Sequence, residues 1–300
     1  MTIDVDDLIA GQLLALLVGV VISLCGVAWR RARIRRGARK LWQLGSPNQL
    51  AIAISDSGTV HTGDYLRPMT GLGQVTSVGL LTPSLARAYK DLPPDLVRFA
   101  TDCGERDVRG DLVILGGPKT NCLTAQLFEA LPESFPVRMT VANGTEIHWS
   151  GPTVDAVFPG GAARPDTIGG KDFGIILRLP NVFDDGQGTI TLFAGVHTYG
   201  TLAAAWHFAH RPKKLTAMAA KTKPFAVLVT VDVGENSRPL NPRVLDDMSL
   251  DEVPRRTAPL GAVTSGAAPP PHEPQPSERA ADAPEDQHPL DVGQLRDVPP

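Results

Sequence analysis

Two short stretches of this 300-residue chain combine glycine with side chains that can bind or transfer charge. The first contains Gly116, Gly117, Lys119 and Asn121 and directly follows the apolar run 112–115. Glycines let the backbone turn sharply and leave its N–H groups uncovered. A helix that begins here would add its dipole, and the two effects together suit a phosphate or a carboxylate. We therefore expect these four residues to bind an anionic ligand.

The second stretch runs from Gly195 to Thr201 and again stands between an apolar run and a helical pattern. Histidine is the side chain that most often acts as a general acid or base, which makes His197 the candidate for acid–base catalysis. Tyr199 could stack on a nucleotide base. Together with Gly200 and Thr201, these side chains are expected to complete a site for a nucleotide or a related phosphorylated ligand. The alternative is that the glycines of both stretches form ordinary turns and that the lysine faces solvent.

Apolar runs elsewhere in the chain predict the strands that would position these loops. The runs lie at 50–54, 112–115, 173–179, 189–194 and 225–231. Strands that alternate with helices predict an α/β fold with a Rossmann-like, mostly parallel sheet. The carboxyl ends of parallel strands face one edge of a sheet, so both glycine loops are expected to meet there. Asn143-Gly144, between two further apolar runs, predicts an antiparallel hairpin insertion.

Apolar residues at helical spacing predict the helices. They lie at 73–89, 94–101, 118–131, 201–209 and 215–221. Pro83 is expected to interrupt the first of them, and Thr201 is expected to cap the fourth. The sequence Gly71-Leu-Gly-Gln-Val-Thr76 partly matches a dinucleotide-binding fingerprint, but its last position is threonine and no strand runs directly into it. We interpret it as a structural turn.

The first 47 residues carry a different pattern. Residues 8–29 are apolar and uncharged, and at about 1.5 Å per residue they are long enough to span a bilayer, so they predict a transmembrane helix. Residues 30–47 are basic, whereas residues 1–7 hold three aspartates and no Lys or Arg. This asymmetry predicts an extracytoplasmic N-terminus, a basic juxtamembrane segment and a cytoplasmic domain at 48–253. We therefore expect a single-pass protein of the cell membrane that contacts the lipid bilayer. A cleaved signal peptide and a buried soluble helix are the alternatives.

The C-terminal residues 254–300 are rich in proline, alanine and acidic residues and contain almost no aromatics. Such a composition cannot bury enough apolar surface to order itself, so it predicts a disordered tail. The proline-rich element at 269–274 could bind a protein partner.

Composition and the lack of certain motifs argue against several function classes. A formal net charge of −3 gives no reason to expect a nucleic-acid partner. Three cysteines without a C-x-x-C pair argue against a disulfide framework and against a structural zinc site. The sequence also lacks the P-loop, H-E-x-x-H and G-x-S-x-G motifs. No metal site is predicted, and the sequence identifies no cofactor.

Three segments, 112–121, 172–181 and 194–204, carry a resemblance to a group of poorly characterised bacterial Rossmann-like domains. The shared features are a Gly-Gly-Pro-x-x-Asn loop and a Gly-x-His-x-x-Gly-Thr loop, and the resemblance covers residues 48–232. It implies a nucleotide sensor or a nucleotide-processing effector beside a membrane helix, and it supplies no established catalytic residues. Our leading hypothesis is therefore a single-pass, membrane-anchored cytoplasmic domain that binds a nucleotide or a related phosphorylated ligand. The alternatives are a hydrolase of a nucleotide or NAD-type glycosidic bond, and a membrane-tethered interaction module without a small ligand.

Overall fold

The computed structural model describes the backbone of residues 5–63, 65–141, 144–160, 170–184, 187–219, 224–234 and 239–250. Within these ranges, side chains are described from Leu16 onward, apart from residues 212, 239 and 240. The predicted disordered tail at 254–300, its proline-rich element and Asn143 of the predicted hairpin turn lie outside the described residues.

A seven-stranded sheet forms the centre of the domain, and its two halves differ in strand direction. In order across the sheet, its strands are β12 (Pro239–Ser249), β11 (Phe225–Val233), β9 (Lys171–Pro180), β10 (Thr189–Gly195), β5 (Leu112–Leu115), β1 (Ala51–Ile54) and β4 (Val97–Phe99). The pairs between β10 and β4 are parallel, whereas those between β12 and β10 are antiparallel. The sheet is therefore mixed, so the predicted α/β class is confirmed, whereas the prediction that the sheet is mostly parallel is wrong.

The antiparallel half of the sheet follows from short connections. β9 ends at Pro180 and β10 begins at Thr189, and the N–H of Asn181 donates to the carbonyl of Gly188 across the turn at 3.1 Å. A parallel pair needs a crossover of about a dozen residues or more, so this link permits a hairpin and nothing else. β12, which the sequence did not lead us to expect, also follows β11 after a short link and pairs with it antiparallel.

Each face of the central sheet packs against a separate apolar layer. Alternate residues of β5 serve both layers, because Leu112 and Ile114 point to one cluster of buried residues while Val113 and Leu115 point to the other. The first cluster contains α4 (Cys122–Ala130) and an antiparallel sheet of β6 (Val137–Val141), β7 (Thr145–Ser150) and β8 (Asp155–Pro159), which supplies the predicted hairpin. The second contains α2 (Leu72–Ala88), α5 (Thr198–His210), α6 (Pro212–Ala219) and the end of α1 (Val5–Trp42). The remaining elements are α3 (Glu105–Val108), the hairpin β2 (Thr59–Thr62) and β3 (Tyr65–Pro68), and the 3-10 turns η1 (Pro47–Gln49) and η2 (Ala100–Asp102).

Two predicted helices differ from what is observed. α2 runs without a break through Pro83, since Leu81 and Leu85 on either side of the proline are fully buried and hold the helix against the sheet. The helix predicted at 94–101 is replaced by β4 and η2, because Val97 and Phe99 align with β1 at the edge of the sheet. In both places tertiary packing overrides the local secondary-structure preference of the sequence.

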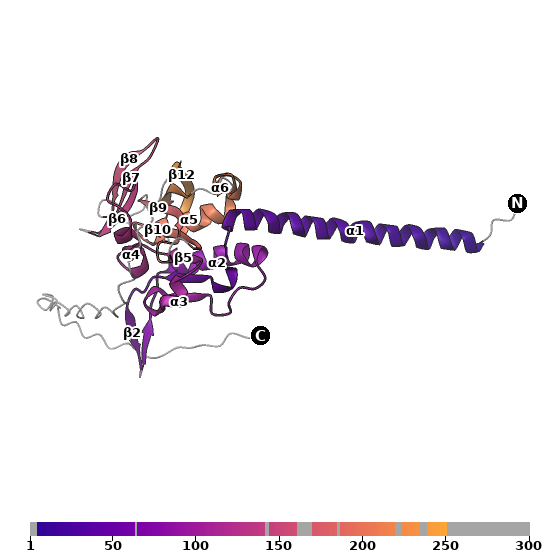
Figure 1. The fold of residues 1–300 in the computed structure, drawn as a ribbon, viewed down its shortest axis with the longest axis horizontal. Helices are drawn as coiled ribbons and strands as arrows, with labels where there is room; N and C mark the ends of the chain where they lie inside the picture. The colour runs from indigo at the N-terminus through magenta and orange to yellow at the C-terminus, as the bar shows by residue number, and fades with distance from the viewer. Residues whose placement is uncertain are drawn as a thin grey trace, which may run out of the picture. The chain divides into compact units, whose positions relative to one another are not determined.

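α1 is a single helix of 38 residues that continues from the apolar segment through the basic one (Figure 1). In the part of the chain that the structure describes, no helix combines the length and the apolar character needed to cross a bilayer. The predicted transmembrane helix at 8–29 and the predicted location in the cell membrane are therefore wrong.

The last turn of α1 is built into the domain. Leu41 and Trp42 are buried, and the buried guanidinium of Arg178 on β9 donates to the carbonyl oxygens of both. Burial lowers the pKa of Arg178 to about 10, which still leaves it charged at neutral pH. Arg39 of α1 also donates to the carbonyl of Ala88 at the end of α2, at 2.8 Å. These bonds satisfy carbonyls that the ends of both helices would otherwise leave without partners.

Candidate functional site

The two glycine loops named from the sequence lie side by side at one edge of the sheet. β5 and β10 are parallel neighbours in register, with Leu115 opposite Phe193. The N–H of Gly116, the first residue after β5, donates to the carbonyl of Phe193 at 2.9 Å. The structure thus brings the loops after both strands to the same place, as the rule for parallel strands led us to expect.

A small hollow lies between these loops, and we call it the edge hollow. Its volume is about 180 Å³. Its walls come from the loops that follow β1, β5 and β10, from the first turns of α2 and α5, and from β7. The residues that line it are Ser57, Gly71, Gln74, Gly117, Lys119, Thr120, Thr145, Gly195, Val196, His197, Thr198 and Thr201.

The paired glycines allow close contact between the loops. Gly116 has φ +114°, a conformation that side-chain-bearing residues rarely adopt, and a Cβ atom there would collide with the hydroxyl of Ser55. At Gly117 a Cβ atom would lie 3.0 Å from the carbonyl oxygen of Gly195 in the neighbouring loop. Gly117 lines the edge hollow, whereas Gly116 is buried beneath it.

Asn121 has a structural role that its predicted role as a ligand-binding residue did not include. It is fully buried and forms the N-cap of α4, where its Oδ1 accepts from the N–H groups of Leu123 and Thr124 at 3.1 and 3.2 Å. Its Nδ2 donates to the carbonyls of Leu115 and Ala53 at 3.1 and 3.3 Å. With these four bonds the side chain is fully engaged, and α4 begins after Asn121 rather than at Pro118.

The N-terminus of α5 already holds an anion from within the protein. Asp172 of β9 is 1 % exposed, and its two carboxylate oxygens accept from the N–H groups of His197 at 3.2 Å and Gly200 at 2.6 Å. Burial raises the pKa of Asp172 above its ordinary value, while the hydrogen bonds from the amides and the nearby His197 oppose that rise. Nothing in the sequence places Asp172 beneath a helix that begins 26 residues later.

The remaining residues of the second loop have separate environments. The Nε2 atom of His197 lies 2.8 Å from the carbonyl oxygen of Gly160. A carbonyl can only accept, so Nε2 carries the proton and Nδ1 of a neutral His197 is the acceptor. Tyr199 packs against the apolar layer of α2 and α5 rather than lining the hollow, and Gly200 is buried against the backbone of Phe173. The predicted N-cap at Thr201 is wrong, because α5 begins at Thr198 with His197 as its cap.

α2 also contributes to the edge hollow, which the sequence did not lead us to expect. Gly71 and Gln74 line it, and the N–H of Gly73 donates to the hydroxyl of Thr198 at 3.0 Å. A Cβ atom on Gly73 would collide with that threonine, so the glycine allows the starts of α2 and α5 to touch. The Gly71–Thr76 sequence could have indicated this contribution. We interpreted it as a structural turn because its last position is threonine and no strand runs directly into it.

The chemical character of the edge hollow is that of a binding site for a small polar group. Its lining contains hydroxyls, the Gln74 amide, the His197 imidazole and the exposed cation Lys119, and none of the described lining residues is a carboxylate. Cys122 stands nearby in the first turn of α4, but burial raises the pKa of its thiol above the ordinary value, so it is not activated as a nucleophile.

Comparison of the chain with protein-family models, with curated proteins and with solved structures finds no match. The resemblance to bacterial Rossmann-like domains therefore stays a prediction.

Proposed function

We propose that the edge hollow binds the phosphoryl group of a small ligand such as a nucleotide. The observation that carries the proposal is the meeting of the first turn of α2 with the exposed cation Lys119 in a hollow whose described lining has no carboxylate. The N-terminus of α2 and the lysine each favour an anion, whereas amides at the start of α5 already bind Asp172, and hydroxyl groups in the lining add hydrogen-bond donors. These features act together because they face one small volume.

The size of the hollow limits which part of a ligand it can enclose. Its volume of about 180 Å³ is below the roughly 300–1,000 Å³ that is typical of pockets for whole small molecules. A phosphoryl group fits inside, and a nucleoside would extend outward over the loops. The parallel strands β10, β5, β1 and β4 are compatible with a Rossmann-like arrangement, in which ligands bind at the carboxyl ends of the strands.

Binding without reaction is the function that this arrangement supports best. The candidate catalytic residue His197 has its Nε2 engaged by the Gly160 carbonyl, and Asp172 contacts its backbone N–H rather than its ring. The lining residues therefore give no nucleophile held against a general base, which covalent hydrolysis would require. We favour a sensor over the alternative of a nucleotide hydrolase.

The test is calorimetry on the full chain with adenosine 5′-monophosphate, inorganic phosphate and adenosine. The proposal expects the monophosphate to bind and adenosine to bind at least tenfold more weakly, since the phosphoryl group supplies the anion. Lys119→Ala should weaken binding of the monophosphate by about threefold to tenfold, because an exposed charge contributes modestly and is screened by salt. Lys90→Ala removes another exposed lysine, which does not line the hollow, and is the matched control.

Two results would contradict the proposal. One is equal affinity for adenosine and its monophosphate, which would show that the phosphoryl group is not recognised. The other is an absence of binding by folded wild-type protein to either phosphate-containing probe at millimolar concentration.

A further inference from the structure

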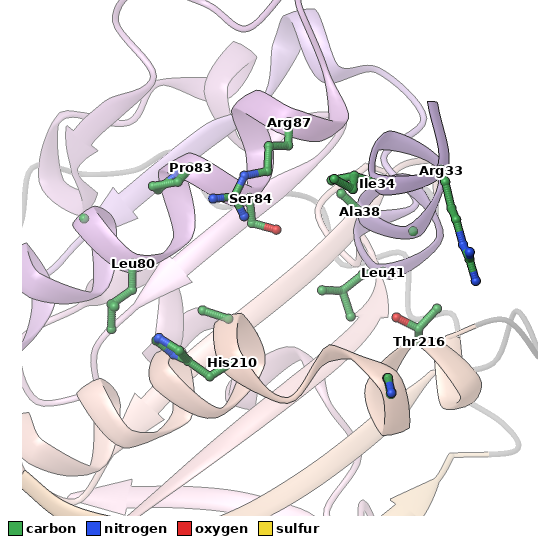
Figure 2. A pocket seen from close by; sticks show the side chains of 14 residues that line it. Arg33, Ile34, Ala38, Leu41, Leu80, Pro83, Ser84, Arg87, His210 and Thr216 are labelled. Atoms are coloured by element: carbon green, nitrogen blue, oxygen red, sulfur yellow. The ribbon is translucent and has the colours of Figure 1, made fainter. Parts of the chain in front are cut away.

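A larger hollow lies where α1 meets α2 and the α5–α6 segment, and we call it the junction groove (Figure 2). Its volume of about 870 Å³ falls within the roughly 300–1,000 Å³ of typical small-molecule sites. Figure 2 shows side chains from all three walls turned toward one space, with Ile34 on α1, Leu80 on α2 and His210 at the end of α5. The junction groove is separate from the edge hollow, since none of its lining residues lines the other.

Hydrogen bonds between α1 and α2 hold two walls of the junction groove in place. The indole Nε1 of Trp42 donates to the hydroxyl of Ser84 at 3.0 Å, and Arg39 donates to the carbonyl of Ala88 at 2.8 Å. Trp42 also packs against Phe208 of α5, with ring centroids 4.7 Å apart. The groove is thus a formed feature of the junction rather than a gap between unconnected helices.

Two glycines inside the helices keep the groove open. Gly37 of α1 and Gly79 of α2 both line it, and a Cβ atom on either would meet no other atom within 4 Å. Neither glycine has a positive φ. Glycine is among the least favourable residues in a helix interior, and neither backbone strain nor a close neighbour requires it at these two positions. The consequence of both glycines is free space along the walls.

The charges around the groove have one sign. Its apolar walls include Ile34, Leu41 and Leu80, and its cations are Arg33, Arg87 and Lys213, whereas none of its described lining residues is a carboxylate. In Figure 2 the guanidinium of Arg87 lies close to Ser84, while Arg33 extends away from the shared space. Arg87 is therefore the cation best placed to meet a charged group, and Lys213 is a second cation that lines the groove.

We propose that the junction groove binds a monomeric amphiphile with a single aliphatic chain and an anionic head group. Apolar walls on α1 and α2 would enclose the chain, which is stabilised by removal from water. The head group would bind Arg87 and Lys213, which have no carboxylate partner in the described lining of the groove. A zwitterionic or cationic amphiphile would also bury its chain, but it would lack the net attraction between an anionic head group and these two cations. The inference concerns a site apart from the edge hollow and does not depend on the proposed nucleotide binding.

The probe is dodecanoate, kept below the concentration at which it forms micelles and titrated into the full chain by calorimetry. Gly79→Leu fills the groove from α2, and Gly37→Leu fills it from α1, so each should weaken dodecanoate binding at least tenfold. Gly26→Leu is the matched control, because Gly26 also lies in α1 with no atom within 4 Å of a Cβ but outside the groove. Far-UV circular dichroism checks that helix content is kept. If one of the two filling variants fails to fold, the other decides.

The head group is tested with dodecyltrimethylammonium, which has the same chain and the opposite charge, and with acetate, which lacks the chain. We expect the cationic analogue to bind at least tenfold more weakly than dodecanoate and acetate to show no binding. Arg87→Gln should weaken dodecanoate binding about tenfold, since a charge-assisted contact is lost, and should leave binding of the cationic analogue no weaker than in the wild type, since a repulsion is removed. Arg106→Gln, an exposed arginine outside the groove, is the control.

Three outcomes would overturn the proposal. The first is an absence of dodecanoate binding by the wild-type chain. The second is unchanged affinity in both folded filling variants, which would place the amphiphile elsewhere, for example on the exposed apolar side chains of α1. The third is equal affinity for the anionic and cationic probes, which would remove the role of the arginine and the lysine.

Discussion

Replacement of Asn121 separates a structural role from a role in ligand binding. We expect Asn121→Ala to destabilise the domain substantially, because the change removes all four hydrogen bonds of a fully buried side chain. Asn121→Ser is the informative companion. Serine is as good an N-cap as asparagine, but it cannot reach across to the carbonyls of β1 and β5.

The magnitude follows from what each variant leaves without a partner. Loss of the cap costs about 1 kcal/mol. Loss of the two Nδ2 bonds costs about 1–3 kcal/mol in total, since buried carbonyls lose a donor, although the Leu115 carbonyl keeps a bond from the Ser55 hydroxyl at 3.1 Å. The sum for Asn121→Ala is about 2–4 kcal/mol, or a fall in melting temperature of about 4–16 °C for a domain of this size. Asn121→Ser should recover about 1 kcal/mol of that loss.

Urea unfolding followed by circular dichroism measures these differences, with the slope compared between variants to check that the transition stays two-state. Asn48→Ala, at an exposed asparagine in η1, is the control and should change stability by less than about 0.5 kcal/mol. A loss below about 0.5 kcal/mol for Asn121→Ala would refute the structural role. So would a folded Asn121→Ser variant that binds adenosine monophosphate more than tenfold less tightly at nearly full stability, because Asn121 would then act on the ligand.

Two further predictions concern ionisable groups whose pKa is raised by burial. Burial raises the pKa of Cys103 to about 12 and also raises that of Cys122, whereas Cys25 is exposed, so a thiol reagent at pH 8 should modify Cys25 rapidly and the other two only upon unfolding. Equal rates for all three cysteines in native protein would contradict this. Burial also raises the pKa of Asp172, so the folded state binds this proton more tightly than the unfolded state. The stability that this group contributes should be fully present below about pH 4 and should be lost as the pH rises through the folded-state pKa. Asp172→Asn should flatten this decline, which is measured as the urea midpoint between pH 3 and 8. An unchanged pH dependence in the variant would refute the raised pKa of Asp172.

The parts of the fold that the sequence predicted correctly are those with strong, short-range signals. The apolar runs at 112–115 and 189–194 correspond to β5 and β10, and the rule that parallel strands end at a common edge placed the two glycine loops together. The relative directions of neighbouring strands were predicted poorly, because we gave more weight to the alternation of strands and helices than to the length of the connections. The link between the apolar runs at 173–179 and 189–194 is so short that it already required β9 and β10 to be antiparallel.

The elements that were missed give weak local signals. β4 has three residues with Arg98 at its centre, and β12 contains two prolines and two adjacent aspartates, so neither forms an apolar run. Edge strands need to bury only one side and tolerate such residues, and both strands lie at the edges of the sheet. The role of Asn121 was missed for a related reason. An N-cap can be identified only when the start of its helix is known, and Pro118 suggested a start that is too early.

Asp172 shows why a helix N-terminus in a sequence does not by itself specify a ligand site. The sequence of the second glycine loop predicted free amides at the start of α5. The carboxylate of Asp172 instead accepts hydrogen bonds from two of those amides, so it occupies the position where an external anion would bind. An ionised Asp172 would also repel a second anion at that end of α5, and its burial keeps the repulsion from being screened by solvent. Attraction for a phosphoryl group in the edge hollow must then come mainly from Lys119 and from the first turn of α2, where Gly71 and Gln74 form the wall. The sequence feature set aside as a structural turn therefore contributes more to the proposed site than Tyr199 and Gly200, which the sequence placed in it.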